Sequence, residues 1–264
     1  MTLTFIKLTL VICVYSLLFF LEHLKPYFKE RKAHISHSIR NLSLATTNTI
    51  LGAGLFVLFI HQTFLFTEKH QLGLLNYLTI NDIWKLITAI ILIDLWQYCW
   101  HRLNHSLPFL WRFHRVHHSD KELDASSGVR FHPGEIFLST LARLLVIPLL
   151  GIQLSHLISY EIIMMSIVFF HHSNIRLNES SDQLLRKLIV TPHMHRLHHS
   201  DQQTETDSNY GNIFSVWDKF FRTYTMRSIE NNFSFGLGND FKNEEWNSYT
   251  GMLKIPLKDT AKLT

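Results

Sequence analysis

The sequence predicts an all-α integral membrane protein with about four to five membrane helices, two of them in a hairpin, and a cytoplasmic helical cap. Three observations predict this class. Of the 264 residues, 47% are hydrophobic and only 17% are charged, whereas about 25% are charged in an average soluble domain. The hydrophobic residues are concentrated in five long runs. Three groups of histidines at helical spacing occupy the more polar segments that follow the third and the fifth of these runs.

The five apolar runs account for the membrane helices, because a spanning helix needs about 20 mostly apolar residues. The first two runs meet this requirement, and the second extends back toward Leu42. The last three are borderline and contain charges, among them Lys85, Asp94 and Arg143, which either face the protein interior or reach toward the membrane surface. The first run lacks a clear small-residue cleavage site, so we expect an uncleaved anchor helix. The runs are residues 3–21, 50–66, 83–100, 136–154 and 157–170.

Basic residues predict the orientation of these helices, because lysine and arginine accumulate in short cytoplasmic loops. The loop between the first two runs contains five of them, whereas residues 67–82 contain one lysine and two acids. The third run therefore ends on the cytoplasmic side, and the short connection between the last two runs returns the chain there as a hairpin. The five basic residues are Lys25, Lys29, Arg31, Lys32 and Arg40.

The domain organisation and several exclusions follow from the same composition. Residues 1–175 are expected to form the transmembrane bundle with the first two histidine groups, and residues 176–264 the cytoplasmic cap with the third. The two cysteines, Cys13 and Cys99, lie in apolar stretches and support neither a disulfide framework nor a cysteine zinc site. A net charge of +4 is too small to indicate nucleic-acid binding.

Three histidine groups indicate a metal site. They are His101-Arg-Leu-Asn-His105, His114-Arg-Val-His117-His118 and His195-Arg-Leu-His198-His199. Offsets of three and four residues place side chains on one helical face. Adjacent histidines point about 100° apart on a helix, so each pair can reach two metals. With His171-His172 the ligands exceed the needs of one tetrahedral zinc. Imidazole-only ligation suits iron, and leaves zinc and copper open.

The spacing HxxxH, HxxHH, HxxHH resembles the fatty acid hydroxylase superfamily, which includes membrane-bound sterol desaturases and C-4 sterol methyl oxidases. The resemblance is closest to its bacterial sterol-desaturase-like branch and spans residues 94–224. Arg222 departs from it, since the family usually has glycine there. The segments that carry the resemblance are Trp100-His101-Arg102, Leu110-Trp111-Arg112-Phe113-His114-Arg115, Arg130-Phe131-His132-Pro133-Gly134-Glu135, Thr191-Pro192, and Asn209-Tyr210-Gly211 through Trp217-Asp218 to Thr223.

The resemblance implies a di-iron centre, with zinc as a substitute, that uses O2 to hydroxylate or desaturate a lipid C–H bond. The lipid could be a sterol, a fatty acyl chain, a carotenoid or an ether lipid. No catalytic residue beyond the metal centre is implied. His193 falls on a variable position, and His132, His171, Glu135 and Asp218 either bind metal or support a ligand. The implied ligands are His101, His105, His114, His117, His118, His172, His195, His198 and His199.

An external electron donor is also implied, because the chain has neither a glycine-rich dinucleotide motif nor a cysteine set for an iron–sulfur cluster. A ferredoxin, a cytochrome or a flavoprotein reductase would serve. The resemblance to a bacterial branch also implies a bacterial inner membrane, and the orientation predicted from the basic residues places the site on its cytoplasmic face. The arginines near the site either dock an acidic donor or face lipid phosphates. They are Arg102, Arg112, Arg115 and Arg196.

Two other functions remain as alternatives. A metal-binding or transport protein would need ligand residues within its membrane spans, whereas these histidines lie at helix ends and in the cap. A membrane di-zinc hydrolase would act without oxygen or a reductant.

Overall fold

Helices make up the regular secondary structure of the part of the chain that the structure describes. This computed structural model describes residues 3–29, 34–228, 233–241 and 243–258. Only isolated β-bridges occur besides the helices within these ranges. The all-α prediction is therefore confirmed. Arg31 and Lys32, which contributed to the predicted orientation, lie outside the described residues.

Among the described residues, four helices are long and apolar enough to cross a membrane, as predicted. They are α1 (Leu3–Leu24), α5 (Asp82–Ser106), α7 (Pro133–Leu150) and α8 (Leu154–His172). A fifth span exists only if a bent pair counts as one, since Ile35–Leu55 and Val57–Tyr77 are inclined by 56°. This pair comprises α2 (His34–Leu55), α3 (Val57–Lys69) and α4 (Leu74–Tyr77).

The bend corrects the sequence prediction for residues 50–66, which are not one straight helix. The break lies at Phe56, between α2 and α3. Gly52 and Gly54 precede it, and glycine weakens a helix by about 1 kcal/mol relative to alanine. The Phe56 side chain is 7% exposed and packs edge-on against Phe137 of α7. This tertiary contact favours a turn of the chain at a point where the apolar pattern alone continues.

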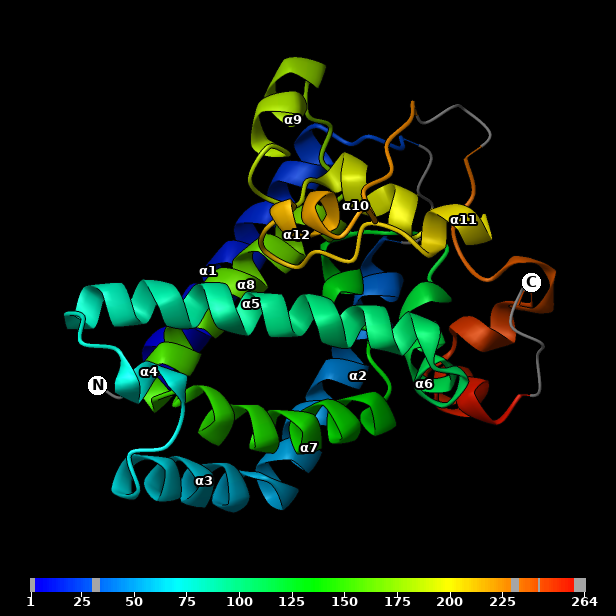
Figure 1. Ribbon diagram of the computed structural model, residues 1–264. Helices are drawn as coiled ribbons and strands as arrows, with labels where there is room; N and C mark the ends of the chain where they lie inside the picture. Colours follow the sequence, from blue (N-terminus) through cyan, green and yellow to red (C-terminus); the bar gives the residue numbers. More distant parts are fainter. Residues whose placement is uncertain (1–2, 30–33, 229–232, 242, 259–264) are drawn as a thin grey trace.

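The predicted hairpin of α7 and α8 is present, and its two helices diverge. Gly151 ends α7 in the left-handed region at φ 73°, where glycine is favoured. From this turn α7 packs on α2 and α3, whereas α8 packs on α1, α5 and the 3₁₀ helix η1 (Ala125–Val129). Figure 1 shows α7 beneath α5 and α8 passing behind it. The ends of α7 and α8 that are farthest from this turn both lie near the histidine groups.

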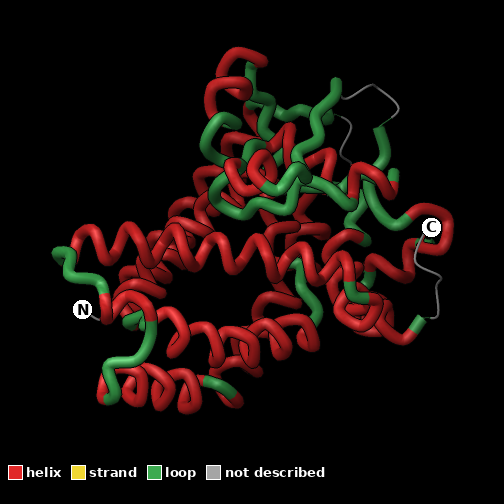
Figure 2. The backbone as a smooth tube through the Cα atoms, viewed as in Figure 1, coloured by secondary structure: helices red, strands yellow, loops and turns green. Residues whose placement is uncertain are grey.

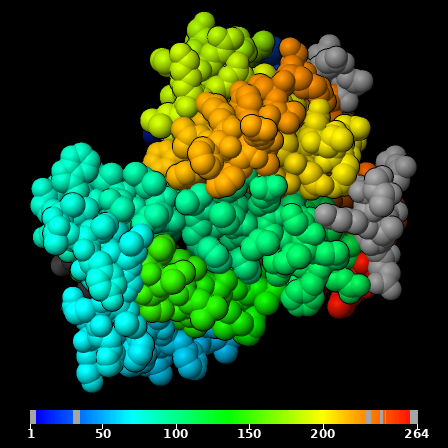
Figure 3. All heavy atoms as spheres, viewed as in Figure 1, coloured from blue at the N-terminus to red at the C-terminus, as the bar shows by residue number. Residues whose placement is uncertain are grey.

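Short helices and loops form the remaining layer beside the long helices. Figure 2 shows the loops gathered on the side of α9–α12, and Figure 3 shows the same yellow-to-orange segments lying over α5. The short helices of the described residues that have not yet been named are α6 (Pro108–His118), α9 (Glu179–Leu185), α10 (Pro192–His198), α11 (Gln203–Thr206), α12 (Val216–Phe220), α13 (Tyr249–Lys254), η2 (Gly238–Phe241), η3 (Glu244–Asn247) and η4 (Ile255–Leu257).

Charges inside the apolar runs bind other parts of the chain. The buried Asp94 carboxylate of α5 accepts hydrogen bonds from the backbone N–H groups of Ile213 and Phe214, both at 3.1 Å, and from Trp217 Nε1 at 2.8 Å. It thereby fixes the loop before α12 to α5. Arg143 of α7 pairs with Glu161 of α8 at 3.0 Å, and Lys7 of α1 contacts the same carboxylate at 2.5 Å. Arg143 therefore has a partner within the protein, one of the two possibilities left open for it.

Candidate metal centre

Four helices bring the predicted ligands together. His101 and His105 occupy the last turns of α5, which ends just before Pro108. Pro108 starts α6, which carries the second group of histidines, and His172 is the last residue of α8. The third group lies on α10, where the Thr191 side chain caps the helix by accepting from Met194 N and Pro192 follows. The predicted helix start at Thr191-Pro192 is confirmed.

All nine predicted ligands lie in two buried groups of ring nitrogens, and within each group the ligand atoms are within 4.8 Å of one another. Each HxxHH segment divides between the groups. On α6, His114 and His118 face the first group while His117 faces the second. On α10 and its C-cap, His195 and His199 face the second group while His198 faces the first. The first group is His101, His105, His114, His118 and His198, and the second is His117, His172, His195 and His199.

The rings are oriented by oxygens on the outside of the groups. In the first group, His101 Nδ1 lies 2.8 Å from the Tyr210 carbonyl oxygen and His198 Nδ1 lies 2.6 Å from that of Ser208. His114 Nδ1 lies 2.7 Å from Glu135 Oε1. In the second group, His172 Nδ1 faces the carbonyl of Val168 at 2.8 Å. A nitrogen facing an oxygen acceptor carries the proton, so Nε2 of each ring presents its lone pair inward.

The inward nitrogens are spaced as ligands of one ion would be. His101 Nε2 lies 3.1 Å from Nε2 of both His114 and His198, although all three present lone pairs. With metal–nitrogen bonds of about 2.1 Å, two ligands at right angles would be about 3.0 Å apart. His195 Nε2 repeats this spacing in the second group, 3.0 Å from His172 and 3.1 Å from His199. The residues therefore fit a pair of transition-metal ions held by nitrogen alone.

Buried nitrogens without a hydrogen-bond partner support the same fit. They include both ring nitrogens of His118 and the Nε2 atom of His105. A buried polar atom left unsatisfied costs about 1–3 kcal/mol. A metal ion would satisfy these atoms, whereas no hydrogen-bond partner does so within the described part of the chain.

Burial keeps five of the candidate ligand rings on α6, on α10 and at the C-cap of α10 neutral, which metal binding requires. Burial lowers the pKa of His198 to about 3. Burial, reinforced by neighbouring histidines, holds the pKa of the other four rings well below the ordinary value. These four rings are His117, His118, His195 and His199. Protons therefore do not compete for these nitrogens near pH 7.

The four residues that were expected either to bind metal or to support a ligand occupy different positions around the site. Glu135 contacts a candidate ligand, His114. Asp218 touches no ligand ring, contrary to the expectation that it accepts from one. It accepts from the backbone N–H groups of Tyr210 and Gly211 at 2.7 and 2.8 Å, and so positions the loop whose carbonyl faces His101. His171 lies outside both groups and stacks on His195 with ring centroids 4.0 Å apart.

His132 caps α7 and lies outside both groups. Its Nδ1 atom accepts from Gly134 N at 2.9 Å, and Nε2 lies 3.3 Å from the Leu253 carbonyl. Both ring nitrogens therefore have backbone partners.

The sequence reasoning missed several residues that support the site. Phe131 stacks on His117 with centroids 4.6 Å apart, and Asp207 Oδ1 lies 3.3 Å from His105 Nδ1. His37 bridges Asp120 and Asp124, both at 2.7 Å, and fixes α2 to the segment that follows His118. Asp120 could have been noticed in the sequence, because it is an acidic residue two positions after His118, the last histidine of an HxxHH group. The carbonyl partners of the rings leave no such signal, because every residue has a carbonyl.

The arginines expected to meet an electron donor or lipid are only partly available. Arg102 and Arg112 are exposed, whereas Arg115 and Arg196 are buried. Arg115 Nη2 donates to the Ile255 carbonyl at 2.6 Å. Arg196 Nη2 donates to the carbonyls of Ser173 and Ile175 and so joins α10 to the end of α8.

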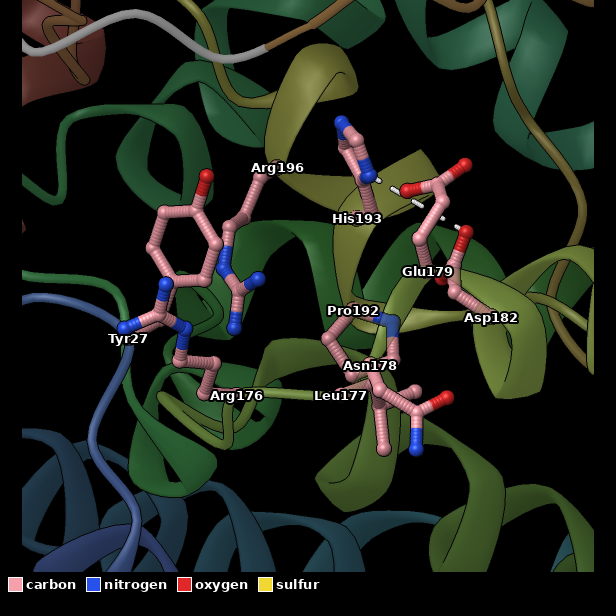
Figure 4. Close-up of a pocket in the computed structure, with 9 residues that line it drawn as sticks. All are labelled: Tyr27, Arg176, Leu177, Asn178, Glu179, Asp182, Pro192, His193 and Arg196. Atoms are coloured by element: carbon pink, nitrogen blue, oxygen red, sulfur yellow. Dashed lines mark ion pairs between the residues drawn. The ribbon is translucent and has the colours of Figure 1, made fainter.

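His193, the variable histidine of α10, lies in a separate pocket. Figure 4 shows it beside Glu179 and Asp182, across from Tyr27 and Arg196. The side chains of His193, Glu179 and Asp182 form a third cluster of potential metal ligands. Arg186 already pairs with Asp182 at 2.9 Å and with Glu179 at 3.1 Å, so the protein itself offsets part of the negative charge of this cluster.

Comparisons with known proteins identify the family. Alkylglycerol monooxygenase of Homo sapiens is 27% identical over 53% of this chain and 31% of its own length. Ornithine lipid hydroxylase OlsE of Rhizobium tropici is 31% identical over 53% of this chain and 41% of its own length. Cholesterol 25-hydroxylase of Homo sapiens is 25% identical over 54% of this chain and 52% of its own length. The aligned part of the chain thus spans about a third to a half of these relatives.

No solved structure matches the chain significantly. The fatty acid hydroxylase family model matches residues 86–223, just over half of the chain. This segment contains the nine histidines of the two groups. The chain therefore belongs to the fatty acid hydroxylase family.

Proposed function

We propose that this protein is a membrane-bound di-iron oxygenase that uses O2 and external electrons to hydroxylate or desaturate a lipid C–H bond. The observation that carries the proposal is the pair of adjoining, buried, all-histidine groups in a chain of this family. The relatives are named as hydroxylases or monooxygenases of an alkylglycerol, an ornithine lipid and cholesterol. These names support a lipid substrate, and their variety favours no single one among sterols, fatty acyl chains, carotenoids and ether lipids.

In this proposal the five histidines of the first group hold one iron ion and the four of the second hold the other. The bound irons would supply the activation of dioxygen and the oxidation of the substrate C–H bond. Burial lowers the pKa values of five imidazoles on α6, on α10 and at its C-cap and so keeps them neutral, namely His117, His118, His195, His198 and His199. Glu135 and the backbone carbonyls orient the rings that they contact. The apolar helices exclude water and admit the lipid.

The proposed function also needs a membrane bundle, a cap that completes the site and a source of electrons. Residues 1–175 form the membrane bundle and residues 176–264 the cap, with the site at the cytoplasmic face of a bacterial inner membrane. Electrons come from a ferredoxin, a cytochrome or a flavoprotein reductase, and the exposed Arg102 and Arg112 would attract an acidic donor.

Oxygen-dependent oxidation of lipid tests the proposal. We expect the purified protein, supplied with a membrane lipid extract and a reductant, to insert label from isotopically labelled dioxygen into a lipid or to remove two hydrogens from it. Mass spectrometry of the lipids detects either product. Neither product should form without oxygen or without the reductant. Turnover that continues without oxygen in a zinc-containing protein would instead favour the di-zinc hydrolase.

A further inference from the structure

Part of the layer of short helices and loops is fixed to the middle of α5 rather than beyond its end. The buried Asp94 carboxylate binds the loop before α12, and Tyr98 stacks on Phe221 with ring centroids 5.2 Å apart. The Tyr98 hydroxyl also lies 2.8 Å from Thr223 Oγ1. Figure 1 shows α12 above the middle of α5. Residues 213–223 are therefore held along the side of a candidate membrane span.

The position of these contacts along α5 places the loop at the depth of the membrane. α5 begins at Asp82 and rises about 1.5 Å per residue, so Asp94 lies about 18 Å and Tyr98 about 24 Å from its start. The hydrocarbon core of a bilayer is about 30 Å thick. Measured from Asp82, the core therefore extends past both residues, and a tilt of the helix makes their depths smaller still.

The backbone of this loop is suited to a place with little water. Irregular backbone at membrane depth needs hydrogen-bond partners within the protein. Two buried residues, Asp94 and Asp218, provide them through their carboxylates and through the Asp218 carbonyl. The donors are the backbone N–H groups of Tyr210, Gly211, Ile213, Phe214, Thr223 and Tyr224.

The end of α9 lies beside this loop and continues its surface. Ser215 N donates to the Leu188 carbonyl at 3.0 Å, and Lys219 Nζ donates to the Lys187 carbonyl at 3.0 Å. Both hydrogen bonds join α12 and the residue before it to the segment that follows α9. The exposed side chains of this joint surface, which we call the α9–α12 face, are Leu184, Lys187, Leu188, Lys219, Phe220 and Arg222.

The α9–α12 face combines apolar and cationic side chains. Three of its members are apolar, among them Phe220, which is 76% exposed. The other three are cationic, and none of them forms an ion pair with a carboxylate within the described residues. The acids of α9, Glu179 and Asp182, pair with Arg186 instead. Exposed apolar side chains beside lysine and arginine are typical of segments that lie in a membrane interface and attract anionic lipids.

Arg222 occupies a backbone conformation that favours glycine. Its φ is 60°, in the left-handed region that a residue with a Cβ atom adopts at a cost. The Arg222 side chain is exposed, so packing within the protein does not offset this cost. A contact between the guanidinium and an anionic group outside the protein would offset it, and glycine could not make that contact.

We propose that the α9–α12 face inserts into the leaflet on the side of the metal centre. Its apolar side chains lie among the lipid chains at the membrane boundary, and its cations, above all Arg222, bind the phosphates of anionic lipids. The inference does not depend on the proposed oxygenase activity. It moves part of residues 176–264, expected to form a cytoplasmic cap, into the membrane interface.

Spin labelling of the full chain in nanodiscs of equal parts phosphatidylcholine and phosphatidylglycerol tests the insertion. Phe220→Cys carries the label, in a background with Cys13→Ala and Cys99→Ala. Thr204→Cys on α11 is the matched control, because Thr204 is also exposed. Dissolved O2 concentrates in lipid, whereas a nickel chelate stays in water. We expect O2 to relax the label at position 220 more than the chelate does, and the reverse at position 204.

Photolabelling in the same nanodiscs tests the preference for anionic lipid. Either phosphatidylglycerol or phosphatidylcholine carries a diazirine in its acyl chain, and peptide mass spectrometry measures the label in residues 214–224. We expect Arg222→Gly to lose about fivefold of the phosphatidylglycerol label, because one basic residue at an anionic surface accounts for about this factor. Arg222→Lys should keep the label, since it keeps the charge. Labelling by phosphatidylcholine should change little in either variant.

Thermal unfolding in a neutral detergent separates the backbone conformation from the lipid contact. Without anionic lipid, Arg222→Gly should unfold about 2–4 °C above the wild type, because glycine relieves the left-handed conformation. Arg222→Lys should unfold with the wild type. Equal unfolding temperatures of Arg222→Gly and the wild type would overturn the argument that arginine is disfavoured here.

The spin label also distinguishes the other possible occupants of the face. Stronger relaxation by the nickel chelate at position 220 would place the face in water, as a docking site for an acidic electron donor requires, and would overturn the insertion. Relaxation by neither reagent would show a protein contact, such as a second copy of the chain, and would overturn it too. Phosphatidylglycerol labelling that Arg222→Gly leaves unchanged would overturn the role of Arg222. These measurements need no turnover, so failure of the proposed function would leave their outcome intact.

Discussion

Replacing His118 or His199 by alanine is expected to abolish lipid oxidation, because each change removes a ligand from a different group. His118 belongs to the first group and His199 to the second, and their rings stack with centroids 4.5 Å apart. If the metals act as a pair, either loss disables the centre. The effect should exceed the ~10–100-fold typical of losing a residue that only supports a ligand. Product formation in the presence of oxygen and reductant measures it.

His193→Ala is the matched control for both variants. His193 lies on α10 two residues before the proposed ligand His195, but its side chain faces the pocket with Asp182. We expect this variant to keep wild-type activity and metal content. Full activity of His118→Ala or His199→Ala would refute the ligand assignment.

Replacing Glu135 by alanine is expected to weaken metal retention by the first group about 10–100-fold. The carboxylate lies 2.7 Å from His114 Nδ1, and both residues are buried. Alanine would remove the acceptor that orients the ring, and would leave Nδ1–H without a partner in a buried site. Chelator competition followed by metal analysis measures the change.

Glu135→Gln separates orientation from charge in the same assay. Glutamine keeps a carbonyl oxygen that can accept from His114 but removes the negative charge. We expect metal retention between those of the wild type and Glu135→Ala. Retention in Glu135→Ala equal to that of the wild type would show that His114 needs no such support.

The histidine groups were predictable because helical geometry is local. An offset of four residues places His114 and His118 on one face, while His117, adjacent to His118, points about 100° away from it. The structure shows this division between two groups. That His172 is a ligand was implied by the family resemblance, whereas its place in the second group was not predicted, since spacing cannot relate α8 to α10.

Other features depend on tertiary contacts that the sequence pattern does not encode. The break at Phe56 falls inside an apolar run that continues on both sides, and the contact with Phe137 lies far along the chain. Asp94 was visible as an acid in an apolar run, but its partners in the loop before α12 were not. Whether His132 binds metal or supports a ligand depends on where its ring nitrogens point, and this requires coordinates.

Metal content of the anaerobically purified protein tests the central claim most directly. The two histidine groups predict two bound metals per chain, and the proposed function predicts that both are iron. Elemental analysis against the protein concentration gives the ratio. Two irons per chain, with loss of metal in His118→Ala and in His199→Ala but not in His193→Ala, is the expected result. Stoichiometric zinc in place of iron, or metal content unchanged by both ligand substitutions, would contradict the account.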